Sequence, residues 1–564
     1  MQNSAVKWLY KVPGSKKAYI VLLTVVQCLY GASGVLYALF LRSIVDSAVA
    51  KNLEGFIYNA VLIVALVLFQ MLLNAISRWL SELSRATFEN LFKERLMHNI
   101  LRKDFGRVSA IHSGEWLNRL TNDTTLIANN YTEIIPGFAG MAVKMISALV
   151  MITVLDVRFA LIVIPLGILL GFLTFAFRKN MKKLHKKVQE KDGAVRIFMQ
   201  ERISSLMVIR SFAAEDQTEE EEHSKTGEHK KARMRRMRFS NICNFGFAGA
   251  MNGMYIFGVI YCGYGILTGT ISYGTLTAIT QLITQIQSPF ANITGYLPRW
   301  YQMIASAERL MEIERFEDDI TGETIGQDKV KDYYCNSLKS IGLRDVSYTY
   351  YPASNKVSDA NKDSMPVAIK DLNVEIGKGE YVAFTGHSGC GKSTALMLLM
   401  GIYKPDSGSC YMRDLSGSEI ELTSSWHRLY AYVPQGNKLM SGTVRDIVSF
   451  ADKKASGDVE RINSALRIAC ADEFINELDN GIDTVLGERG TGLSEGQMQR
   501  IAIARAIFSE APVLILDEAT SALDDVTEKK VLENLRALTD KTVVIVTHRP
   551  AALEICDKAV EFKE

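Results

Sequence analysis

The sequence lacks a large net charge and closely spaced pairs of cysteines, and each absence excludes a class of protein. Its 564 residues carry 64 Lys and Arg against 62 Asp and Glu, so the formal charge is only +2. That near balance gives no sign of a polyanionic partner, and we expect no nucleic acid. The eight cysteines show no spacing such as C-x-x-C. We therefore expect free thiols in a reducing compartment and not a disulfide framework.

The N-terminus also lacks a signal-peptide cleavage site. Several lysines precede the first apolar run, but no small-residue cleavage motif follows it. A retained first membrane helix is therefore expected in place of a signal peptide. Residues 1–17, with their lysines and Trp8, suit a short helix on the cytoplasmic membrane surface, and a frayed terminus is the alternative.

Long apolar runs, by contrast, fill the chain up to about Pro298. Six of them approach the roughly 20 residues needed to cross a bilayer. The remainder has the composition of a soluble α/β domain. We therefore expect a membrane domain at 1–316, a polar linker at 317–336 and a compact domain at 337–564. The six expected helices lie at about 19–40, 56–77, 134–155, 157–177, 244–267 and 274–297.

Charge in the connecting segments predicts the orientation. The stretch 178–238 is rich in Lys and Arg, whereas the short link 268–273 carries no charge. By the positive-inside rule the long connections, both termini and the C-terminal domain are cytoplasmic. These connections have few Pro or Gly and keep a helical pattern, so we expect the membrane helices to continue into the cytoplasm.

The strongest chemical signal is the sequence GHSGCGKST, which fits the phosphate-loop pattern G-x-x-x-x-G-K-[ST]. The buried strand Tyr381–Thr385 precedes it and the helix Ala395–Met400 follows it, so an isolated Gly-rich turn is the weaker alternative. Its glycines allow backbone N–H groups to curl around a phosphate at a helix N-terminus. Lys392 is expected to reach the outer phosphates and Ser393 to hold Mg²⁺. The predicted phosphate-binding residues are Gly386, His387, Ser388, Gly389, Cys390, Gly391, Lys392, Ser393 and Thr394.

A second motif, Val513–Glu518 (VLILDE), ends a buried strand in two carboxylates. Asp517 is placed to hold Mg²⁺ through water, and Glu518 to polarise the attacking water. The alternative is a solvated acidic pair at a strand end. Beside a phosphate loop, the arrangement predicts hydrolysis of a nucleoside triphosphate.

Three weaker signals lie in the same region. Leu493–Gln497 (LSEGQ) runs into a helix, where the Ser494 hydroxyl and nearby N–H groups offer an anion site or a plain helix cap. Gln435 follows another strand. His548 ends the strand Thr542–Thr547, where it is expected to contact a γ-phosphate or to be structural.

Taken together, these motifs resemble the nucleotide-binding domain of ATP-binding cassette (ABC) transporters. GHSGCGKST is similar to the Walker A motif, and VLILDE to Walker B with the catalytic glutamate Glu518. LSEGQ resembles the signature LSGGQ, with Glu495 in place of a glycine. The resemblance makes His548 the catalytic switch histidine and Gln435 a ligand of ATP and Mg²⁺. It assigns the signature to act in trans through Leu493, Ser494, Glu495, Gly496 and Gln497.

The resemblance extends to smaller elements. Tyr350 is similar to the aromatic residue that stacks on adenine, with Tyr351 as the alternative, and Asp524 closes the D-loop of residues 521–524. Residues 484–490 resemble the exporters' stretch that touches the membrane helices. Two segments, 114–123 and 201–216, resemble the cytoplasmic turns that dock on nucleotide domains. The loop 352–366 is longer than usual.

The resemblance covers essentially the whole chain. Six membrane segments ahead of one nucleotide domain form the exporter-type half-transporter, so it implies an α-helical membrane domain followed by an α/β P-loop NTPase domain. It further implies ATP and Mg²⁺ as cofactors and a second half-transporter chain as partner, in a homodimer or, alternatively, a heterodimer. The expected activity is ATPase-coupled movement of a small molecule, peptide or lipid across a bacterial plasma membrane. An importer on an exporter-like fold, a lipid flippase and an ATP-gated channel or regulator are the alternatives.

Polar side chains within the apolar runs predict where cargo touches. Lys144 lies near the middle of the third run, where a lysine costs about 2.5–3.5 kcal/mol. It is expected to face a cavity or a partner, or else to snorkel to an interface. In the sixth run, at about 100° per residue, the polar side chains fall on one arc opposite an apolar face. We expect this polar arc to line the cargo path, with a helix–helix seam as the alternative. Its residues are Thr277, Gln281, Thr284, Gln285, Ser288 and Asn292.

Overall fold

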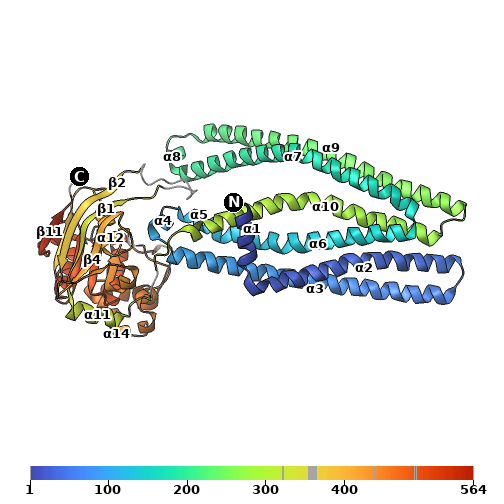
Figure 1. Ribbon diagram of the computed structural model, residues 1–564. Helices are drawn as coiled ribbons and strands as arrows, with labels where there is room; N and C mark the ends of the chain where they lie inside the picture. The colour runs from blue at the N-terminus through green and yellow to red at the C-terminus, as the bar shows by residue number, and fades with distance from the viewer. Residues whose placement is uncertain are drawn as a thin grey trace. The chain divides into compact units, whose positions relative to one another are not determined.

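The structure is a computed structural model that describes residues 2–320, 323–352, 365–436, 438–487, 490 and 492–562. Long helices dominate the first half (Figure 1). Within the described residues they are α2 (Lys17–Val49), α3 (Leu53–Arg102), α6 (Thr124–Leu155), α7 (Val157–Ser204), α9 (Glu215–Leu267) and α10 (Tyr273–Glu312). Each predicted membrane segment lies inside one of these helices. As predicted, the helices also extend well beyond the length that a bilayer needs.

The chain forms two compact units, which are described separately. The membrane unit comprises Met1–Phe92 and Asp123–Glu308, and the nucleotide unit comprises Lys93–Asn122 and Arg309–Glu564. This division differs from the predicted boundary at 316. The segment Lys93–Asn122, which we call the first cytoplasmic turn after its expected side of the membrane, belongs to the same compact unit as the C-terminal residues.

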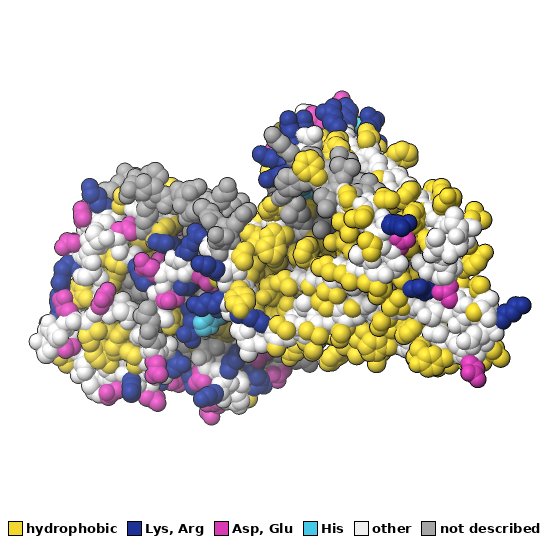
Figure 2. Space-filling view, turned by 45° about the vertical axis from the view of Figure 1, so that its right-hand side comes forward, with side chains coloured by type: hydrophobic (Ala, Val, Ile, Leu, Met, Phe, Trp, Pro, Cys, Tyr) yellow, Lys and Arg dark blue, Asp and Glu magenta, His cyan; other side chains and the backbone are white. Residues whose placement is uncertain are grey.

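Four helical stretches of the described residues are long and apolar enough to cross a membrane: Gly14–Val49, Leu53–Arg102, Ser113–Leu155 and Glu215–Leu267. The predicted spans in α7 and α10 are not among them, and parts of both helices carry side chains outside the described set. Figure 2 shows hydrophobic side chains spread over one face of the long helices. That surface is what contact with lipid tails requires.

The membrane unit is held together by close helix packing. Helix α2 packs against α6, and α7 packs against α9 (Figure 1). At Gly31 the two backbones of α2 and α6 approach so closely that a Cβ would lie 2.6 Å from the Gly140 oxygen. Small residues at such crossings let van der Waals packing replace the hydrophobic effect, which is weak between helices in lipid.

The N-terminal helix α1 (Gln2–Lys11) belongs to the same unit. Ala5 and Leu9 are buried, and the Trp8 ring stacks on Phe92 with 5.6 Å between centroids. The predicted short N-terminal helix is therefore present, although its position at a membrane surface stays a prediction.

The nucleotide unit is built on two main sheets. A parallel sheet has the order β11-β3-β10-β9-β6, and an antiparallel sheet has the order β2-β1-β4-β5. The central parallel strands β3, β9 and β10 are buried and apolar, as expected for strands covered on both faces, whereas the edge strand β11 is mostly exposed. Their bounds are β3 (Tyr381–Thr385), β6 (Tyr430–Val433), β9 (Val513–Asp517), β10 (Thr542–Val546) and β11 (Lys558–Glu561); the antiparallel strands are β1 (Leu338–Thr349), β2 (Val367–Gly377), β4 (Ser407–Asp414) and β5 (Glu419–Glu421).

Helices and a short hairpin complete the unit. Two small strands, β7 and β8, pair with each other, and helix α12 follows the phosphate loop. The bounds are β7 (Gly442–Thr443), β8 (Val485–Leu486), α12 (Lys392–Leu399), α13 (Val444–Val448), α14 (Val459–Ile468), α15 (Asp472–Asn476), α16 (Glu495–Phe508), α17 (Asp525–Arg536) and α18 (Pro550–Glu554).

Residues 317–336, predicted as a polar linker, are largely part of the nucleotide unit. Helix α11 (Gln327–Asn336) buries Val330 and Tyr334 in the unit's core. The Tyr334 hydroxyl hydrogen-bonds with the Thr542 hydroxyl at 2.9 Å, and Lys331 pairs with Glu510. The linker prediction is wrong here because a few buried side chains on one face are enough to dock this otherwise polar helix.

Replacing Gly31 with Ala should destabilise the membrane unit, because a Cβ cannot fit without moving α2 or α6. Overpacking of this kind costs about 1–3 kcal/mol. We expect a lower midpoint of thermal unfolding, followed as loss of monodisperse protein in detergent. Gly263→Ala in α9 is the matched control, since a Cβ there would meet nothing within 4 Å. Equal midpoints for the two variants would contradict the close approach.

Candidate functional site

The predicted nucleotide-binding residues gather at one edge of the parallel sheet. Strand β3 leads into the phosphate loop, β9 ends at Asp517, and Gln435 follows β6. His548 follows β10, which pairs with β9 so that Val546 lies opposite Asp517. Because the carboxyl ends of parallel strands share one edge, this is where ligands bind in open α/β sheets.

The phosphate loop has the shape that its glycines predict. Gly386, Gly389 and Gly391 have φ values of +133°, +89° and +94°, which favour glycine over residues with side chains. At Gly386 a Cβ would lie 2.6 Å from the Phe562 oxygen, and at Gly391 it would lie 2.9 Å from the Ala368 oxygen. The loop then enters α12, whose N-terminus points its free N–H groups at the same place.

Lys392 lies within this loop and is 6% exposed. Its Nζ donates to the carbonyl oxygens of Gly386 at 2.6 Å and His387 at 2.8 Å. The loop carbonyls thereby hold the ammonium group in the cradle formed by the loop backbone. The arrangement suits a lysine that neutralises phosphate charge.

Ser393 and Asp517 form the candidate Mg²⁺ site. Asp517 is 2% exposed, accepts a hydrogen bond from the Tyr432 hydroxyl at 3.2 Å and is hydrogen-bonded to Ser393. Burial raises the pKa of Asp517, whereas the bonds from Ser393 and Tyr432 oppose that rise. A hydroxyl, a carboxylate and the nearby Gln435 amide are oxygen donors of the kind that Mg²⁺ prefers, so these residues fit the ion.

The predicted base lies beside this set. The Gln435 amide donates from Nε2 to Glu518 Oε2 at 2.8 Å, which brings a residue after β6 to the residue after β9. Glu518 has φ of +50°, a strained value for a residue with a side chain, and its N–H donates to the Val546 oxygen at 3.1 Å. Such strain concentrates at functional sites. His548 is exposed shortly after β10.

Tyr350 lies at the side of the phosphate loop. Its hydroxyl shares a hydrogen bond of 2.5 Å with the Thr394 hydroxyl, and 42% of the residue is exposed. Its ring meets Tyr348 and Tyr403 edge-on, with centroids 5.4 and 6.1 Å away. Tyr351 instead lies against Arg107, 5.1 Å from ring centroid to guanidinium carbon. This geometry favours Tyr350 over Tyr351 for the adenine contact.

The signature residues cap α16. Ser494 Oγ accepts from the Gln497 N–H at 3.2 Å, and Gln497 Oε1 accepts from the Ser494 N–H at 2.8 Å. Ser494 and Glu495 are exposed, whereas Leu493 and Gly496 are half-buried. The helix N-terminus therefore faces solvent in the single chain.

Sequence reasoning missed the residues that hold the D-loop. Buried Gln499, in α16, donates to the Ser521 hydroxyl at 3.0 Å and accepts from the Ala522 N–H at 3.0 Å. From the other side, Arg549 donates to the Ser521 and Leu523 oxygens at 2.9 and 3.0 Å. No local motif marks these two residues, because their partners lie more than about 20 positions away.

The end of the D-loop is anchored too. Arg549 pairs with the buried carboxylate of Glu528 at 2.7 Å, which also accepts from Thr520 at 2.7 Å. Asp524 caps α17 by accepting from the Thr527 N–H at 3.0 Å, a bond that lowers the pKa of Asp524. The signature helix, the D-loop and the residue after His548 thus form one connected network.

The predicted cargo residues divide into two sets. Gln285 is 6% exposed, and its Nε2 donates to the Gly34 oxygen of α2 at 2.6 Å. The cavity prediction is therefore wrong for Gln285, which lies in a seam between α2 and α10. Thr277, Gln281 and Lys144 are half-buried, and Thr284 is exposed. The side chains of Ser288 and Asn292 lie outside those that the structure describes.

The opposite face of α10 is the buried one. Ile279, Leu282 and Ile283 are fully buried, in a core to which α2, α6, α7 and α9 contribute. The exposed edge of the polar arc therefore points away from the core of the membrane unit. An exposed polar stripe on a membrane helix needs water or protein beside it, because lipid does not satisfy it.

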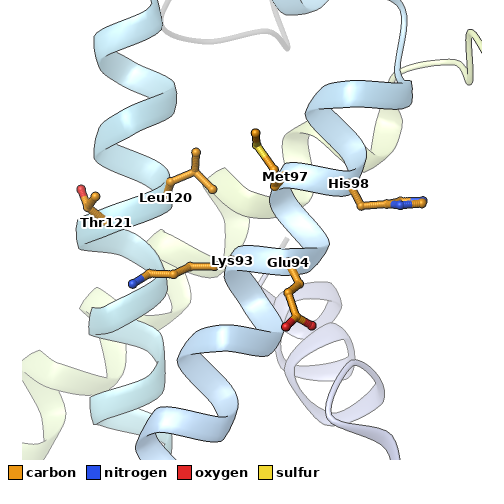
Figure 3. Close-up of a pocket in the computed structure, with 6 residues that line it drawn as sticks. All are labelled: Lys93, Glu94, Met97, His98, Leu120 and Thr121. Carbon is orange, nitrogen blue, oxygen red and sulfur yellow. The ribbon is translucent and has the colours of Figure 1, made fainter. Parts of the chain in front are cut away.

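A separate cavity of about 680 Å³ lies in the first cytoplasmic turn (Figure 3). Helix α3 and the segment η2 (Arg119–Asp123) line it, through Lys93, Glu94, Met97, His98, Leu120 and Thr121. These six residues are distinct from the phosphate loop and from the predicted cargo set. The cavity is therefore not part of the nucleotide site.

The fold and the site define a membrane protein that carries a P-loop nucleotide-binding domain in the same chain. Two family models match it: the "ABC transporter transmembrane region" over residues 18–290 and the "ABC transporter" domain over residues 369–521. The chain belongs to the ABC transporters. These matches confirm the predicted family and the predicted fold class. They also confirm that the protein is an integral membrane protein that binds ATP and couples ATP hydrolysis to transport.

Individual proteins that are similar to this chain belong to the same family. ABC transporter B family member 1 of Dictyostelium discoideum is 30% identical over 475 residues, 84% of this chain but only 50% of that protein. The ATP-dependent lipid A-core flippase of Syntrophus aciditrophicus is 28% identical over 83% of this chain and 74% of its own length. A solved structure of a bacterial Atm1-family ABC exporter with ATP bound has a TM-score of 0.76 and 20% identity. The match covers 97% of this chain and 94% of the exporter, which shows a shared fold.

Replacing Glu518 with Gln should remove steady-state ATP hydrolysis and leave ATP binding intact, because an amide cannot accept the proton of water. General-base catalysis contributes about 10²–10⁴-fold, so we expect kcat to fall by that factor. Binding of a fluorescent ATP analogue and phosphate release, measured on the same purified protein, check the two halves. Lys392→Ala should instead weaken binding. A Glu518→Gln variant that hydrolyses ATP near the wild-type rate would exclude Glu518 as the base.

Proposed function

We propose that the chain is half of an ATP-driven exporter in a bacterial plasma membrane and that it works as a homodimer. One observation carries the proposal: the phosphate loop, Asp517, Gln435 and Glu518 meet at one sheet edge in a chain with membrane-length helices. The name of one similar protein, an ABC exporter, favours outward movement. A lipid flippase is the second candidate, because another similar protein is named a lipid A-core flippase. The nucleotide unit and both termini then lie in the cytoplasm.

The dimer is supported by surfaces that a single chain leaves open. Ser494 and Glu495 are exposed at the N-terminus of α16, where the helix can bind the phosphates held by another chain. The short helix α8 (Leu206–Ser211) and the residue after it expose apolar side chains: Met207 is 86% and Phe212 79% exposed. Apolar groups gathered at the tip of a cytoplasmic helical pair mark a docking surface. A second copy of the chain fits both features, and a heterodimer with a related chain is the alternative.

Within the site, this chain's residues have distinct tasks. Ser393, Gln435 and Asp517 would hold Mg²⁺, which when bound neutralises charge on the β- and γ-phosphates. Lys392 neutralises the outer phosphates, and Tyr350 stacks on the adenine ring. Glu518 accepts the proton of the attacking water, and His548 contacts the γ-phosphate. ATP binding closes two nucleotide units, and hydrolysis releases them.

Transport then requires two conformations of the membrane units. Shifting their ratio from 1:99 to 99:1 takes about 5.5 kcal/mol, which the binding of ATP between two chains has to supply. Thr277, Gln281 and Thr284 are proposed to form a wall of the cargo path, with Ser288 and Asn292 further along α10. Lys144, on α6, would favour anionic or carbonyl-bearing cargo if it faces the same path.

The shared site predicts complementation between two inactive variants. Lys392→Ala and Ser494→Ala chains should each be inactive as homodimers, but a mixed dimer retains one intact phosphate loop opposite one intact signature. An equal mixture should recover about a quarter of the wild-type sites, since half of the dimers are mixed. ATPase activity after co-reconstitution measures the recovery. No recovery, with mixed dimers demonstrated by two affinity tags, would contradict a site built from two chains.

The cargo path predicts a pattern of chemical accessibility along α10. In a background without native cysteines, a water-soluble thiol reagent should label Thr277→Cys, Gln281→Cys and Thr284→Cys. It should spare Ile279→Cys and Leu282→Cys, which the core buries. ATP should change the labelling of the polar positions. Protection of all three polar positions in every nucleotide state would make the arc a seam.

A further inference from the structure

Arg119 is a fully buried, charged side chain outside the nucleotide site. Its Nε pairs with Glu115 Oε1 at 3.0 Å, and its Nη1 donates to the Arg309 oxygen at 2.8 Å. Its Nη2 lies 2.9 Å from Glu312 Oε2, an ion pair whose angles fall outside those of a hydrogen bond. Glu115 comes from α5 (Ser113–Asn118), whereas Arg309 and Glu312 are in the last turn of α10. Arg119 thus ties the first cytoplasmic turn to α10.

The other side of Arg119 leads toward the nucleotide site. Its guanidinium lies over the Trp116 ring, 5.1 Å from the centroid, and the indole donates to the Val108 oxygen at 3.0 Å. Val108 belongs to α4 (Phe105–Ser109), whose first residue, Phe105, stacks on Tyr403 with 5.9 Å between centroids. Tyr403 belongs to a cluster with Tyr348 and Tyr350 beside the phosphate loop, which we call the tyrosine cluster. The first cytoplasmic turn is therefore in contact with this cluster.

That cluster reaches the loop directly. Tyr403 stacks on Tyr348 at 4.9 Å and meets Tyr350 edge-on, and Tyr350 shares its hydroxyl hydrogen bond with Thr394 of the phosphate loop. At Gly106 a Cβ would lie 3.1 Å from the Tyr348 hydroxyl, so α4 sits as close to the cluster as glycine allows. Packed contacts therefore run without a gap from the phosphate loop to Arg119 inside the nucleotide unit.

We propose that Arg119 is the positioning residue that passes the state of the nucleotide site to α10. The inference rests on the proposed function, because α10 is the helix assigned to the cargo path. Helix α10 runs from Tyr273 to Glu312 and contains both its last turn and the polar arc. Pro289 and Pro298 lie along it, and because proline lacks a backbone N–H, each favours a bend. A displacement of the last turn therefore reaches the arc as a change in the bend of one continuous helix. Arg119 also opens η2, a π-helical turn, and such turns mark functional sites more often than plain helix.

The alternative is that Arg119 only stabilises the fold, a role that we call a brace. A buried ion pair adds little stability over a well-packed apolar replacement, yet breaking one partner leaves an uncompensated charge. A brace would therefore lower stability on substitution and leave the response of α10 to ATP intact. A coupling residue would leave ATP binding intact and abolish the response.

The test uses the full chain in lipid nanodiscs, without native cysteines and with Thr284→Cys as reporter on α10. The measured quantity is the ratio of thiol labelling rates with and without ATP and vanadate. In the Arg119→Met variant this ratio should move at least about fivefold toward one, the lower end of typical coupling factors. Binding of a fluorescent ATP analogue and basal ATP hydrolysis should persist. An unchanged ratio in a folded variant overturns the inference.

Three further variants keep the test decisive. Arg413→Met is the matched control, because Arg413 also pairs with two carboxylates, Glu375 and Glu419, but on a strand away from the path. Its labelling ratio should equal that of the parent. Glu312→Gln, which spares the other bonds of Arg119, should also move the ratio toward one. It replaces Arg119→Met should that variant fail to fold. Combining Arg119→Glu with Glu312→Arg should restore at least part of the response, and loss of ATP binding in all Arg119 variants would overturn the proposal.

The parent separates this inference from the proposed function. If the labelling rate of Thr284→Cys in the parent does not change with ATP, the proposed cargo path is contradicted, and so is this inference. If the parent responds and Arg119→Met responds equally, only the role of Arg119 is lost.

Discussion

Holding several negative phosphate oxygens requires many N–H groups that point to one place, and everything else in the nucleotide unit depends on that constraint. The phosphate loop satisfies it because three of its glycines take positive φ angles that other residues avoid. The loop is not free to relax, since neighbouring segments approach it too closely for any Cβ at Gly386 or Gly391. The segments that hold the loop in shape, Ala368 in the antiparallel sheet and Phe562 after β11, are therefore part of the binding site and not only its support.

In the proposed dimer, the same constraint gives the second chain its role at the site. The sheet edge supplies the loop, the Mg²⁺ donors and Glu518, all on one side of the phosphates. The second helix N-terminus with anion-binding groups, at Ser494, is capped and exposed, and its helix is tied through Gln499 to the D-loop. Closing a second chain over the phosphates would add N–H groups from the opposite side. Under the proposed function, that closure would give ATP a reason to drive movement, because ATP would bind more tightly to the closed state than to the open one.

The sequence predicted those parts of the structure that short-range patterns control. Each membrane segment and each strand of the nucleotide site follows from apolar runs, glycines and strand-end carboxylates within about 15 residues. Prediction failed where distant segments meet. Gln281 and Gln285 share one face of α10 by helical phase, yet only Gln285 is buried, because α2 offers it the Gly34 carbonyl. Helical phase gives the direction in which a side chain points but not which helix lies in that direction. The contact of Gln285 with α2 could therefore not be predicted from the sequence.

The docking of α11 and the individual contacts of the first cytoplasmic turn were missed for the same reason. The resemblance indicated that residues 114–123 dock on a nucleotide domain, but it did not indicate which side chains hold them. The contacts that fix these segments join single residues across long stretches of chain: Arg119 with Glu312, and Tyr334 with Thr542. Such contacts leave no periodic signal, because each involves one side chain at each end. The motifs of the nucleotide site could therefore be predicted residue by residue, whereas the parts that connect the site to the helices could not.

Helix α10 shows why that connection matters. Its apolar face is buried in the membrane unit, its last turn is held by Arg119 in the nucleotide unit, and part of its polar arc belongs to neither core. One continuous helix therefore links the two contacts, and Pro289 and Pro298, which lack a backbone N–H, are the places where it bends most easily. The exposed polar positions are the part of α10 that can change neighbours when that bend changes. In the proposed transport path, these positions would exchange contacts with water, protein or cargo, because lipid does not satisfy polar groups.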